Sequence, residues 1–343
     1  MAEESTHSVP APRLLPWHDA AVAQLQSAWG SQRLSHALLL QGQDGLGKRE
    51  LAAWLAAAVL CEKSTATLEH CGQCASCALL AAGSHPDLIW VAPEEGKQQI
   101  SVDQVRAATE RLTKTSYRQG YKIAIVEPAH QMTGSAANGL LKTLEEPTPQ
   151  SLLVLLTSRP SSLLPTVRSR CLKIAVRRPS REQALRWLQA ETGTAIEPQL
   201  LEFTGDAPLR ALEFARGGFD ELNDGMQRSL GQLLAGQNDV TQVATEWAKS
   251  ALPQRLTWLD LWLMSAARSA LGGSVELFTF PARSAHLPSL SRTLNISALY
   301  AMVDRLRALK AQLARTALQR ELAIESWLIA LLQTLGPTSA AHR

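Results

Sequence analysis

A glycine-rich loop that ends in lysine is the first stretch of this sequence that could do chemistry. The loop reads Gly42-Gln43-Asp44-Gly45-Leu46-Gly47-Lys48-Arg49. It fits the phosphate-loop (P-loop) pattern G-x-x-x-x-G-K, in which backbone amides and the lysine hold phosphate groups and a following Ser or Thr ligates Mg²⁺. Arg49 occupies that last position, and a guanidinium cannot ligate a metal cation. Gly42, Gly45, Gly47 and Lys48 thus predict a degenerate nucleotide site without the parts for ATP hydrolysis. Whether ATP binds stays open, and a glycine turn that binds nothing is the alternative.

A lone acid, Glu127, ends a later apolar stretch. Nucleotide-hydrolysing proteins with such a loop normally end this strand with Asp-Glu, where the first acid acts on Mg²⁺ through water and the second orients the attacking water. Glu127 can stand for the first acid, but Pro128 follows it and carries no group that could orient water. The pattern predicts a degenerate magnesium-site strand (Walker B), and a solvated strand end is the alternative.

Four cysteines, Cys61, Cys71, Cys74 and Cys77, form the spacing C-x9-C-x2-C-x2-C. Four thiolates complete a tetrahedron around Zn²⁺ and leave no open position, so we expect a structural zinc site without catalysis. Five cysteines in all are an odd number for a disulfide framework. Scattered free thiols are the bland alternative. An iron–sulfur cluster is less well supported, because the further cysteine and proline of that pattern do not follow Cys77.

The elements that must position these residues alternate along the first half of the chain. Apolar runs predict strands at residues 36–41, 87–91, 121–126, 152–157 and 172–176. Helical spacing predicts helices at residues 20–29, 48–60, from 101 onward behind the N-cap Ser101, 137–146 before Pro147, and 163–170. Strands that alternate with helices, with a phosphate loop after the first strand, predict an α/β fold with a parallel, doubly wound sheet.

The second half of the chain is helical by its pattern. Short helices are expected between residues 178 and 218, a linker at residues 217–220, and longer helices from there to the end. Residues 299–313 and 324–335 carry apolar side chains at helical spacing, which is typical of core-facing stripes. Prolines and serines between residues 274 and 291 predict a long loop between two helices.

Composition excludes several classes of protein. The chain has 343 residues, enough for two or three domains, and no apolar run long enough to span a membrane. Its N-terminus lacks the basic head and apolar segment of a secretory signal, so a cytoplasmic protein is expected. The net charge of +3 is too small to indicate nucleic-acid binding by the chain as a whole. A zinc-containing DNA-binding protein is a rival interpretation, but the segment around the cysteines, Glu62 to Glu69 and Glu94-Glu95, is not basic as a whole.

Four features in combination resemble the bacterial clamp-loader AAA+ family. They are the run 36–40 before the loop, the four-cysteine module, the run Leu140–Pro147 (LLKTLEEP), and Ser169-Arg170-Cys171. The resemblance covers roughly residues 15 to 180, and the remainder is similar in length and helical character only. Arg49 and Pro128 depart from the pattern of the family's gamma/tau motor subunits and fit a non-hydrolysing subunit.

The resemblance implies three domains. They are an AAA+ nucleotide-binding-like domain at residues 1–177 with the zinc module at 61–77, a helical lid domain at 178–218, and an all-α collar domain at 219–343 through which subunits form a ring. It also implies that Arg170, flanked by Ser169 and Cys171, is an arginine finger that reaches into a neighbour's ATP site. Arg210 lies near the family's second phosphate-sensing arginine, and an exposed helical arginine is the alternative.

The function implied is that of a non-hydrolysing component of the DNA polymerase III holoenzyme. It would help load the sliding clamp on primed DNA and would not be an ATPase on its own. The implied partners are gamma/tau and delta subunits, with the clamp and DNA met through the complex and no membrane. A catalytically active gamma/tau-type ATPase is the alternative.

Overall fold

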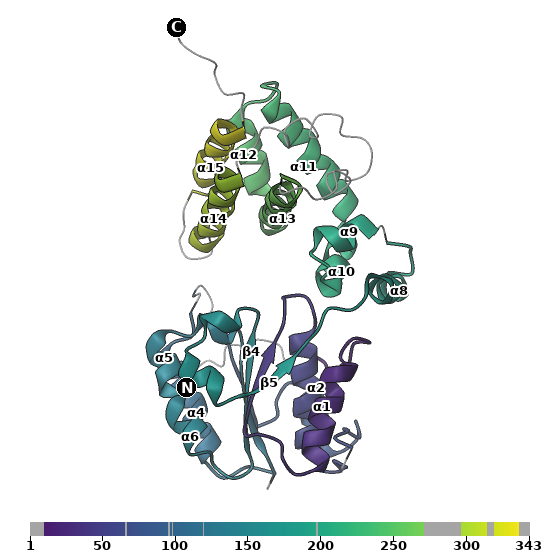
Figure 1. Cartoon of the computed structure of the whole chain (residues 1–343), viewed down its shortest axis with the longest axis vertical. Helices are drawn as coiled ribbons and strands as arrows, with labels where there is room; N and C mark the ends of the chain where they lie inside the picture. The colour runs from purple at the N-terminus through teal and green to yellow at the C-terminus, as the bar shows by residue number, and fades with distance from the viewer. Residues whose placement is uncertain are drawn as a thin grey trace. The chain divides into compact units, whose positions relative to one another are not determined.

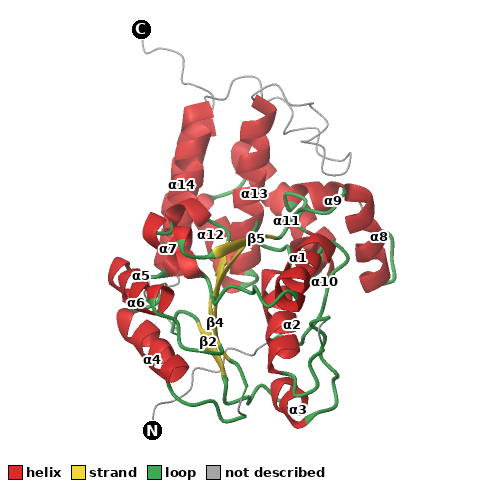
Figure 2. Ribbon diagram, turned by 60° about the horizontal axis from the view of Figure 1, so that its bottom comes forward, coloured by secondary structure: helices red, strands yellow, loops and turns green. Residues whose placement is uncertain are grey.

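The computed structural model describes residues 10–65, 67–94, 97, 99–118, 120–196, 198–270, 296–313 and 319–335. The chain divides into two compact units, Met1–Trp187 and Leu188–Arg343. The first unit holds the sheet and the second is helical (Figures 1 and 2).

The first unit is built on a five-stranded parallel sheet. Its strands are β1 (Ala37–Gln41), β2 (Leu88–Val91), β3 (Lys122–Val126), β4 (Ser151–Thr157) and β5 (Leu172–Ala175). They lie in the order β2-β3-β4-β1-β5, and every neighbouring pair is parallel. The predicted α/β class, the parallel sheet and all five strands are therefore confirmed, with bounds shifted by one residue or less.

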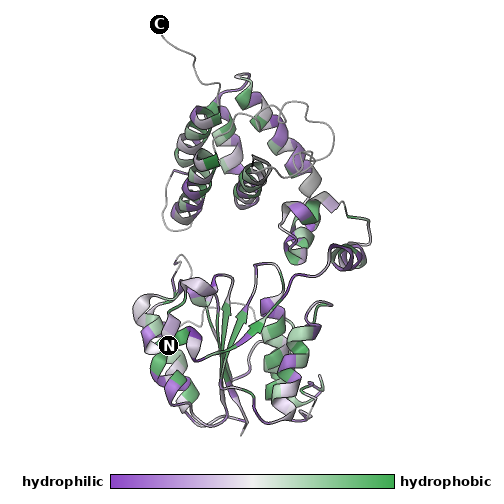
Figure 3. Cartoon of the chain, viewed as in Figure 1, coloured by the Kyte–Doolittle hydropathy of each residue, from purple (hydrophilic) through white to green (hydrophobic). Residues whose placement is uncertain are grey.

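The strands are apolar because helices cover both faces of the sheet. All residues of β3 and β4 are buried, and the strands are the most continuously hydrophobic part of this unit (Figure 3). In the register, Gln41 lies opposite Thr157 on one side and Ala175 on the other. The carboxyl ends of three strands thus meet at one edge, and the loops that follow them are brought together there.

Nine helical segments surround the sheet in the described part of this unit. They are α1 (Asp19–Gly30), α2 (Lys48–Leu60), α3 (Ala75–Ala81), α4 (Val102–Thr113), α5 (Gly134–Gly139), α6 (Leu141–Glu145), α7 (Pro165–Ser169) and the 3-10 turns η1 (Ala129–Gln131) and η2 (Pro160–Ser162). In Figure 1, α1 and α2 lie on one side of the sheet and α4, α5 and α6 on the other. Alternate strand residues such as Ala37 and Leu39 pack against α4 and its neighbours, as a two-residue side-chain period requires.

Two helix predictions had different outcomes. Ser101 caps α4 as predicted: its side chain accepts a hydrogen bond from the Gln104 amide, while the Gln104 side chain accepts one from the Ser101 amide. The single helix predicted for residues 137–146 is wrong in one respect, because it is interrupted at Leu140, between α5 and α6. Gly139, a poor helix former, directly precedes the break.

The second unit is all helical in its described residues. Helix α8 (Arg181–Thr192) leads into it, followed by α9 (Pro198–Phe203), α10 (Pro208–Arg216), α11 (Phe219–Leu234), α12 (Val240–Lys249), α13 (Leu252–Ala270), α14 (Ile296–Leu313) and α15 (Arg320–Leu335). The pairs α13/α14, α12/α15 and α14/α15 pack against each other. The predicted apolar stripes supply this core: Leu299, Met302, Val303 and Leu306 on α14, and Ile324, Trp327, Leu328 and Leu331 on α15, are buried.

The linker predicted at residues 217–220 is shorter than expected. Gly218, in the left-handed conformation with φ 72°, caps α11, which begins at Phe219. The long loop predicted for residues 274–291 lies outside the described residues, and the division into domains at 177 and 218 stays a prediction. No helix among the described residues is long and apolar enough to cross a membrane.

Candidate functional site

The glycine loop has the backbone of a phosphate loop at the carboxyl edge of the sheet. It connects β1 to α2, with Gly45 (φ 83°) and Gly47 (φ 84°) in the left-handed region. A Cβ on Gly47 would come within 2.3 Å of Leu15, and one on Gly42 within 2.5 Å of the Val176 carbonyl oxygen. Glycine is therefore required here both for conformation and for space.

The segment before α1 packs against the loop. The Trp17 indole N–H donates to the Leu46 carbonyl oxygen at 2.9 Å, and His18 Nε2 lies 3.0 Å from the same oxygen. His18 Nδ1 accepts from the Leu15 amide at 3.3 Å, so the proton belongs on Nε2. His18 is fully buried, and this burial lowers its pKa. A neutral His18 thus holds the loop in place through the Leu46 carbonyl oxygen.

Lys48 is directed onto its own loop. Its ammonium donates to the carbonyl oxygens of Gly42 and Gln43, both at 2.9 Å, and to Asp44 Oδ1 at 3.2 Å. The side chain is only 8% exposed. An ammonium has three N–H groups, and all three have acceptors here. Lys48 would have to give up loop contacts to reach a phosphate.

Arg49 lies against Glu127, the residue predicted to end the magnesium-site strand. Arg49 Nε is 2.9 Å from Glu127 Oε2, and the Trp90 indole N–H donates to the same oxygen at 3.2 Å. The guanidinium also lies over the Trp90 ring, 5.6 Å from its centroid. Burial raises the pKa of Glu127, and Arg49 partly offsets this by favouring the carboxylate. The Arg49 guanidinium thus already pairs with the Glu127 carboxylate, which a Mg²⁺ ion would need as a partner.

Thr157, at the end of β4, completes this edge of the site. Its hydroxyl oxygen accepts from the Arg159 amide at 3.0 Å and lies 3.1 Å from His130 Nδ1. The hydroxyl proton is therefore available to His130, whose pKa is lowered first by burial and then by the Arg159 charge. This polar contact links the strand end to the turn after Glu127.

Arg170 follows α7 at the surface of the first unit, away from the loop in the sequence. Its Nη2 is 2.8 Å from Glu145 Oε1 on α6, and its Nη1 donates to the Thr166 carbonyl oxygen at 3.1 Å. The side chain is 38% exposed. The flanking residues are structural in their contacts: Ser169 donates to Thr166, and the buried Cys171 thiol donates to Val167.

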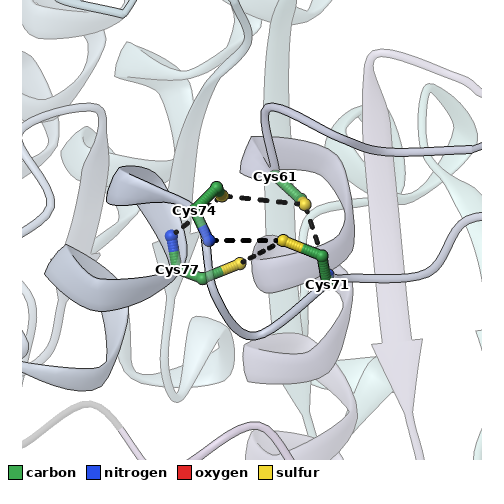
Figure 4. A group of neighbouring side chains, drawn as sticks. All are labelled: Cys61, Cys71, Cys74 and Cys77. Carbon is green, nitrogen blue, oxygen red and sulfur yellow. Dashed lines mark hydrogen bonds between the residues drawn. The ribbon is translucent and has the colours of Figure 1, made fainter.

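The four predicted ligand cysteines converge, as Figure 4 shows. Their sulfur atoms all lie within 4.8 Å of one another, with Cys61 and Cys74 at 3.9 Å and Cys71 and Cys77 at 4.0 Å. A tetrahedron with Zn–S bonds of about 2.3 Å has S···S edges of about 3.8 Å. The donor set and its spacing therefore fit a four-coordinate metal ion of the zinc type.

The backbone of the module is arranged for thiolates. Amides of Gln73 and Cys74 donate to the Cys71 sulfur at 3.5 and 3.3 Å, and they lower its pKa to about 6. Burial and the neighbouring Cys74 raise the pKa of Cys77 to about 12. Thiolates packed this closely need a positive charge between them, which a bound dication would supply. Cys171, the fifth cysteine, is not part of the cluster.

Sequence reasoning missed several residues that the structure places at these sites. Trp90, Thr157 and His130 surround Glu127 and the loop edge, and Glu145 meets Arg170. Trp90 and Thr157 lie at or near the carboxyl ends of predicted strands, and His130 follows one, so parallel-strand topology could have placed these three at this edge. Only the structure reveals the pairings. Arg210, half-buried on α10 in the second unit, is close enough to Lys310 to lower its pKa, after the larger effect of burial; a sensor role for it stays a prediction.

Comparisons with known proteins cover both units. A family model described as DNA polymerase III, delta subunit, matches residues 17–180, and one described as DNA polymerase III, delta subunit, C terminal, matches residues 226–333. A solved DNA polymerase III gamma subunit-related protein from Thermotoga maritima covers 92% of this chain and 99% of its own, at 20% identity and a TM-score of 0.43.

Curated relatives extend the match to most of the chain. The DNA polymerase III subunit delta′ of Escherichia coli is 32% identical over 329 residues, which is 95% of this chain and 97% of the relative. The subunit of the same name from Pseudomonas aeruginosa is 37% identical over 262 residues, 75% of this chain and 78% of the relative. The chain therefore belongs to the DNA polymerase III subunit delta′ family.

Proposed function

We propose that this delta′-family protein is a non-hydrolysing subunit of the replicative clamp loader. It assists ATP-dependent loading of the sliding clamp on primed DNA, and it works with gamma/tau and delta subunits in the cytoplasm. In this proposal residues 1–177 form the AAA+ domain, 178–218 the lid and 219–343 the collar that joins the ring.

One observation carries the non-hydrolysing part of the proposal, the ion pair of Arg49 with Glu127. Phosphoryl transfer needs a phosphate cradle, a Mg²⁺ ion bridging the phosphates and a group that orients water. In this chain the position of the magnesium-ligating hydroxyl is an arginine, that arginine neutralises the nearest acid at 2.9 Å, and Pro128 follows where the water-orienting acid would stand. The loop lysine is also held by its own loop.

Phosphate release by the purified chain, free of motor subunits, tests this part. We expect no turnover above background with ATP and Mg²⁺, because two of the three contributions are missing. Sustained hydrolysis that co-elutes with the chain would contradict the proposal and favour a gamma/tau-type motor.

Arg170 is proposed as the arginine finger for a neighbouring motor subunit. A guanidinium stays charged and can donate two parallel hydrogen bonds to phosphate oxygens. The partial exposure of Arg170 at the surface of its unit supports this role, since a finger must be reachable by the neighbour's ATP.

Zn²⁺ is proposed as the ion of the four-cysteine module, held by Cys61, Cys71, Cys74 and Cys77. It would fix the fold of residues 61–77 and do no chemistry, since four protein sulfurs fill a tetrahedral site. Elemental analysis of the purified chain should find one zinc per chain; iron, or no metal at all, would contradict this.

A further inference from the structure

Glu145 lies in a contact that the sequence motifs do not reveal. It is the last residue of α6, in the run Leu140–Pro147, while Arg170 follows α7. Two of the four features that carried the clamp-loader resemblance are thus joined directly, by a 2.8 Å contact between Glu145 Oε1 and Arg170 Nη2.

Both side chains extend from backbone that is fixed by buried neighbours. Leu144 is 3% exposed, and its carbonyl oxygen lies 3.0 Å from His36 Nε2 before β1. On the other helix, Val167 is fully buried, and its carbonyl oxygen accepts from the Arg170 amide at 3.2 Å and from the Cys171 thiol at 3.3 Å. The distance between the Glu145 and Arg170 backbones is therefore set by the core.

Among the described residues, the contacts of Arg170 leave part of its guanidinium available. Nη2 meets Glu145, and Nη1 donates to the Thr166 carbonyl oxygen at 3.1 Å. A guanidinium has five N–H groups in one plane, so these two acceptors fix the plane while other donors stay free for an anion. Arg170 and Glu145 are 38% and 52% exposed, and ion pairs this exposed add little to stability. Orientation is the effect that remains.

We propose that Glu145 is a positioning residue for Arg170: it holds the guanidinium in the orientation in which it meets the phosphates of a neighbouring subunit's nucleotide. This inference rests on the proposed finger role of Arg170. It assigns to Glu145 a part in phosphoryl transfer without any contact to the nucleotide.

Reconstituted clamp loader, with clamp and primed DNA, gives the test. We expect Glu145→Ala to lower the DNA-stimulated kcat by on the order of tenfold at the dependent site, since misplacing a catalytic group by about 1 Å can cost up to about a hundredfold. KM for ATP should not rise, because removing a carboxylate leaves the site more positive. Glu145→Gln should restore most of the rate, since its amide oxygen can still accept from Nη2. Glu146→Ala, at the exposed next residue, is the matched control and should match wild type.

A double variant separates this inference from the finger role itself. In an Arg170→Ala background, Glu145→Ala should have no further effect. If Arg170→Ala alone leaves the rate unchanged, the proposed finger fails. If Arg170→Ala lowers the rate but Glu145→Ala leaves the rate unchanged or raises it, the positioning role is wrong. An equal loss from Glu145→Ala with and without Arg170 would also overturn it.

Discussion

At the scale of single residues, Arg49 is the main reason that we expect no Mg²⁺-dependent ATP hydrolysis at this loop. Its side chain lies between the Glu127 carboxylate and the Trp90 ring, where it supplies a fixed positive charge. A metal ion at this carboxylate would have to displace a covalently tethered cation. The loop thus departs from the phosphate-loop pattern in two ways: it lacks the Ser or Thr hydroxyl, and the arginine in that position places a positive charge beside Glu127.

Arg49→Thr should therefore not create an ATPase. The change restores a possible Mg²⁺ ligand and frees Glu127, but Pro128 still offers nothing to orient water. It should also cost stability, by roughly 0.5–1 kcal/mol for a pair whose arginine is 44% exposed. Phosphate release should stay at background, and denaturant unfolding measures the cost. Arg49→Met, which keeps bulk but adds no ligand, is the control. Turnover by Arg49→Thr alone would refute this account of the site.

His18 should make the stability of the first unit depend on pH. Burial lowers its pKa in the folded state, so below about pH 6.5 the unfolded chain binds more protons and stability falls as pH falls. His85 and His130 are shifted in the same direction by burial. His18→Gln removes one of these groups at the cost of its two hydrogen bonds, about 1–3 kcal/mol at neutral pH.

Unfolding free energies of wild type and His18→Gln, measured between pH 7.5 and 5, check the sign. The difference in unfolding free energy between wild type and His18→Gln should narrow on acidification. Only the wild type has a histidine at position 18, and protonation of that histidine favours the unfolded chain. A gap that is constant or widens would mean that His18 is not held neutral.

At the scale of elements, the four-cysteine module is connected to the loop after α4. Glu62, in the module, accepts from the Ser76 hydroxyl at 3.2 Å and is 3.0 Å from the Arg118 guanidinium. The amides of Tyr117 and Arg118 donate to the buried Asp87 carboxylate at 2.9 and 3.1 Å. Order in the module should therefore reach residues 114–118.

Removing the metal should loosen both segments. Metal binding in such modules is worth roughly 10–16 kcal/mol, so residues 61–77 should unfold locally without it. We expect Cys71→Ser, or chelation, to speed amide hydrogen exchange in residues 61–77 strongly and in 114–118 more weakly. Cys171→Ser, outside the cluster, is the control. Unchanged exchange in 61–77 after verified metal loss would contradict a structural role.

Local sequence pattern was enough to predict most elements of the first unit. The strands, the glycine loop and the four-cysteine module each have a signature in one continuous stretch of sequence. Strand burial, glycine conformation and ligand spacing are all local properties. Contacts between distant residues leave none. Arg49 with Glu127 and Glu145 with Arg170 depend on strand order and helix packing, which no single run of residues encodes. The break at Leu140 was missed for a related reason, since one glycine lowers helix stability without a fixed outcome.

At the scale of the whole molecule, the chain combines a parallel-sheet unit, which carries the phosphate-type loop, the four-cysteine module and Arg170, with a helical unit built on packed apolar stripes. The first unit keeps the shape of a nucleotide-binding domain while its own side chains satisfy the loop. Arg170, partly exposed at the surface of this unit, is the residue proposed to act on a partner's nucleotide. Such a division of features suits a subunit that acts on a neighbour's nucleotide instead of its own.

The proposed finger role of Arg170 is tested most directly by measuring ATP turnover of the reconstituted clamp loader that carries Arg170→Ala. We expect zinc content, fold and assembly to be unchanged, while clamp- and DNA-stimulated hydrolysis at one motor site falls on the order of a thousandfold. Arg170→Lys should recover little, because an ammonium lacks the planar fork. Arg168→Ala, on α7 two residues before Arg170 and hydrogen-bonded to the Pro160 carbonyl oxygen, is the matched control. Wild-type hydrolysis and clamp loading by the Arg170→Ala complex would contradict the finger and leave this chain a scaffolding role only.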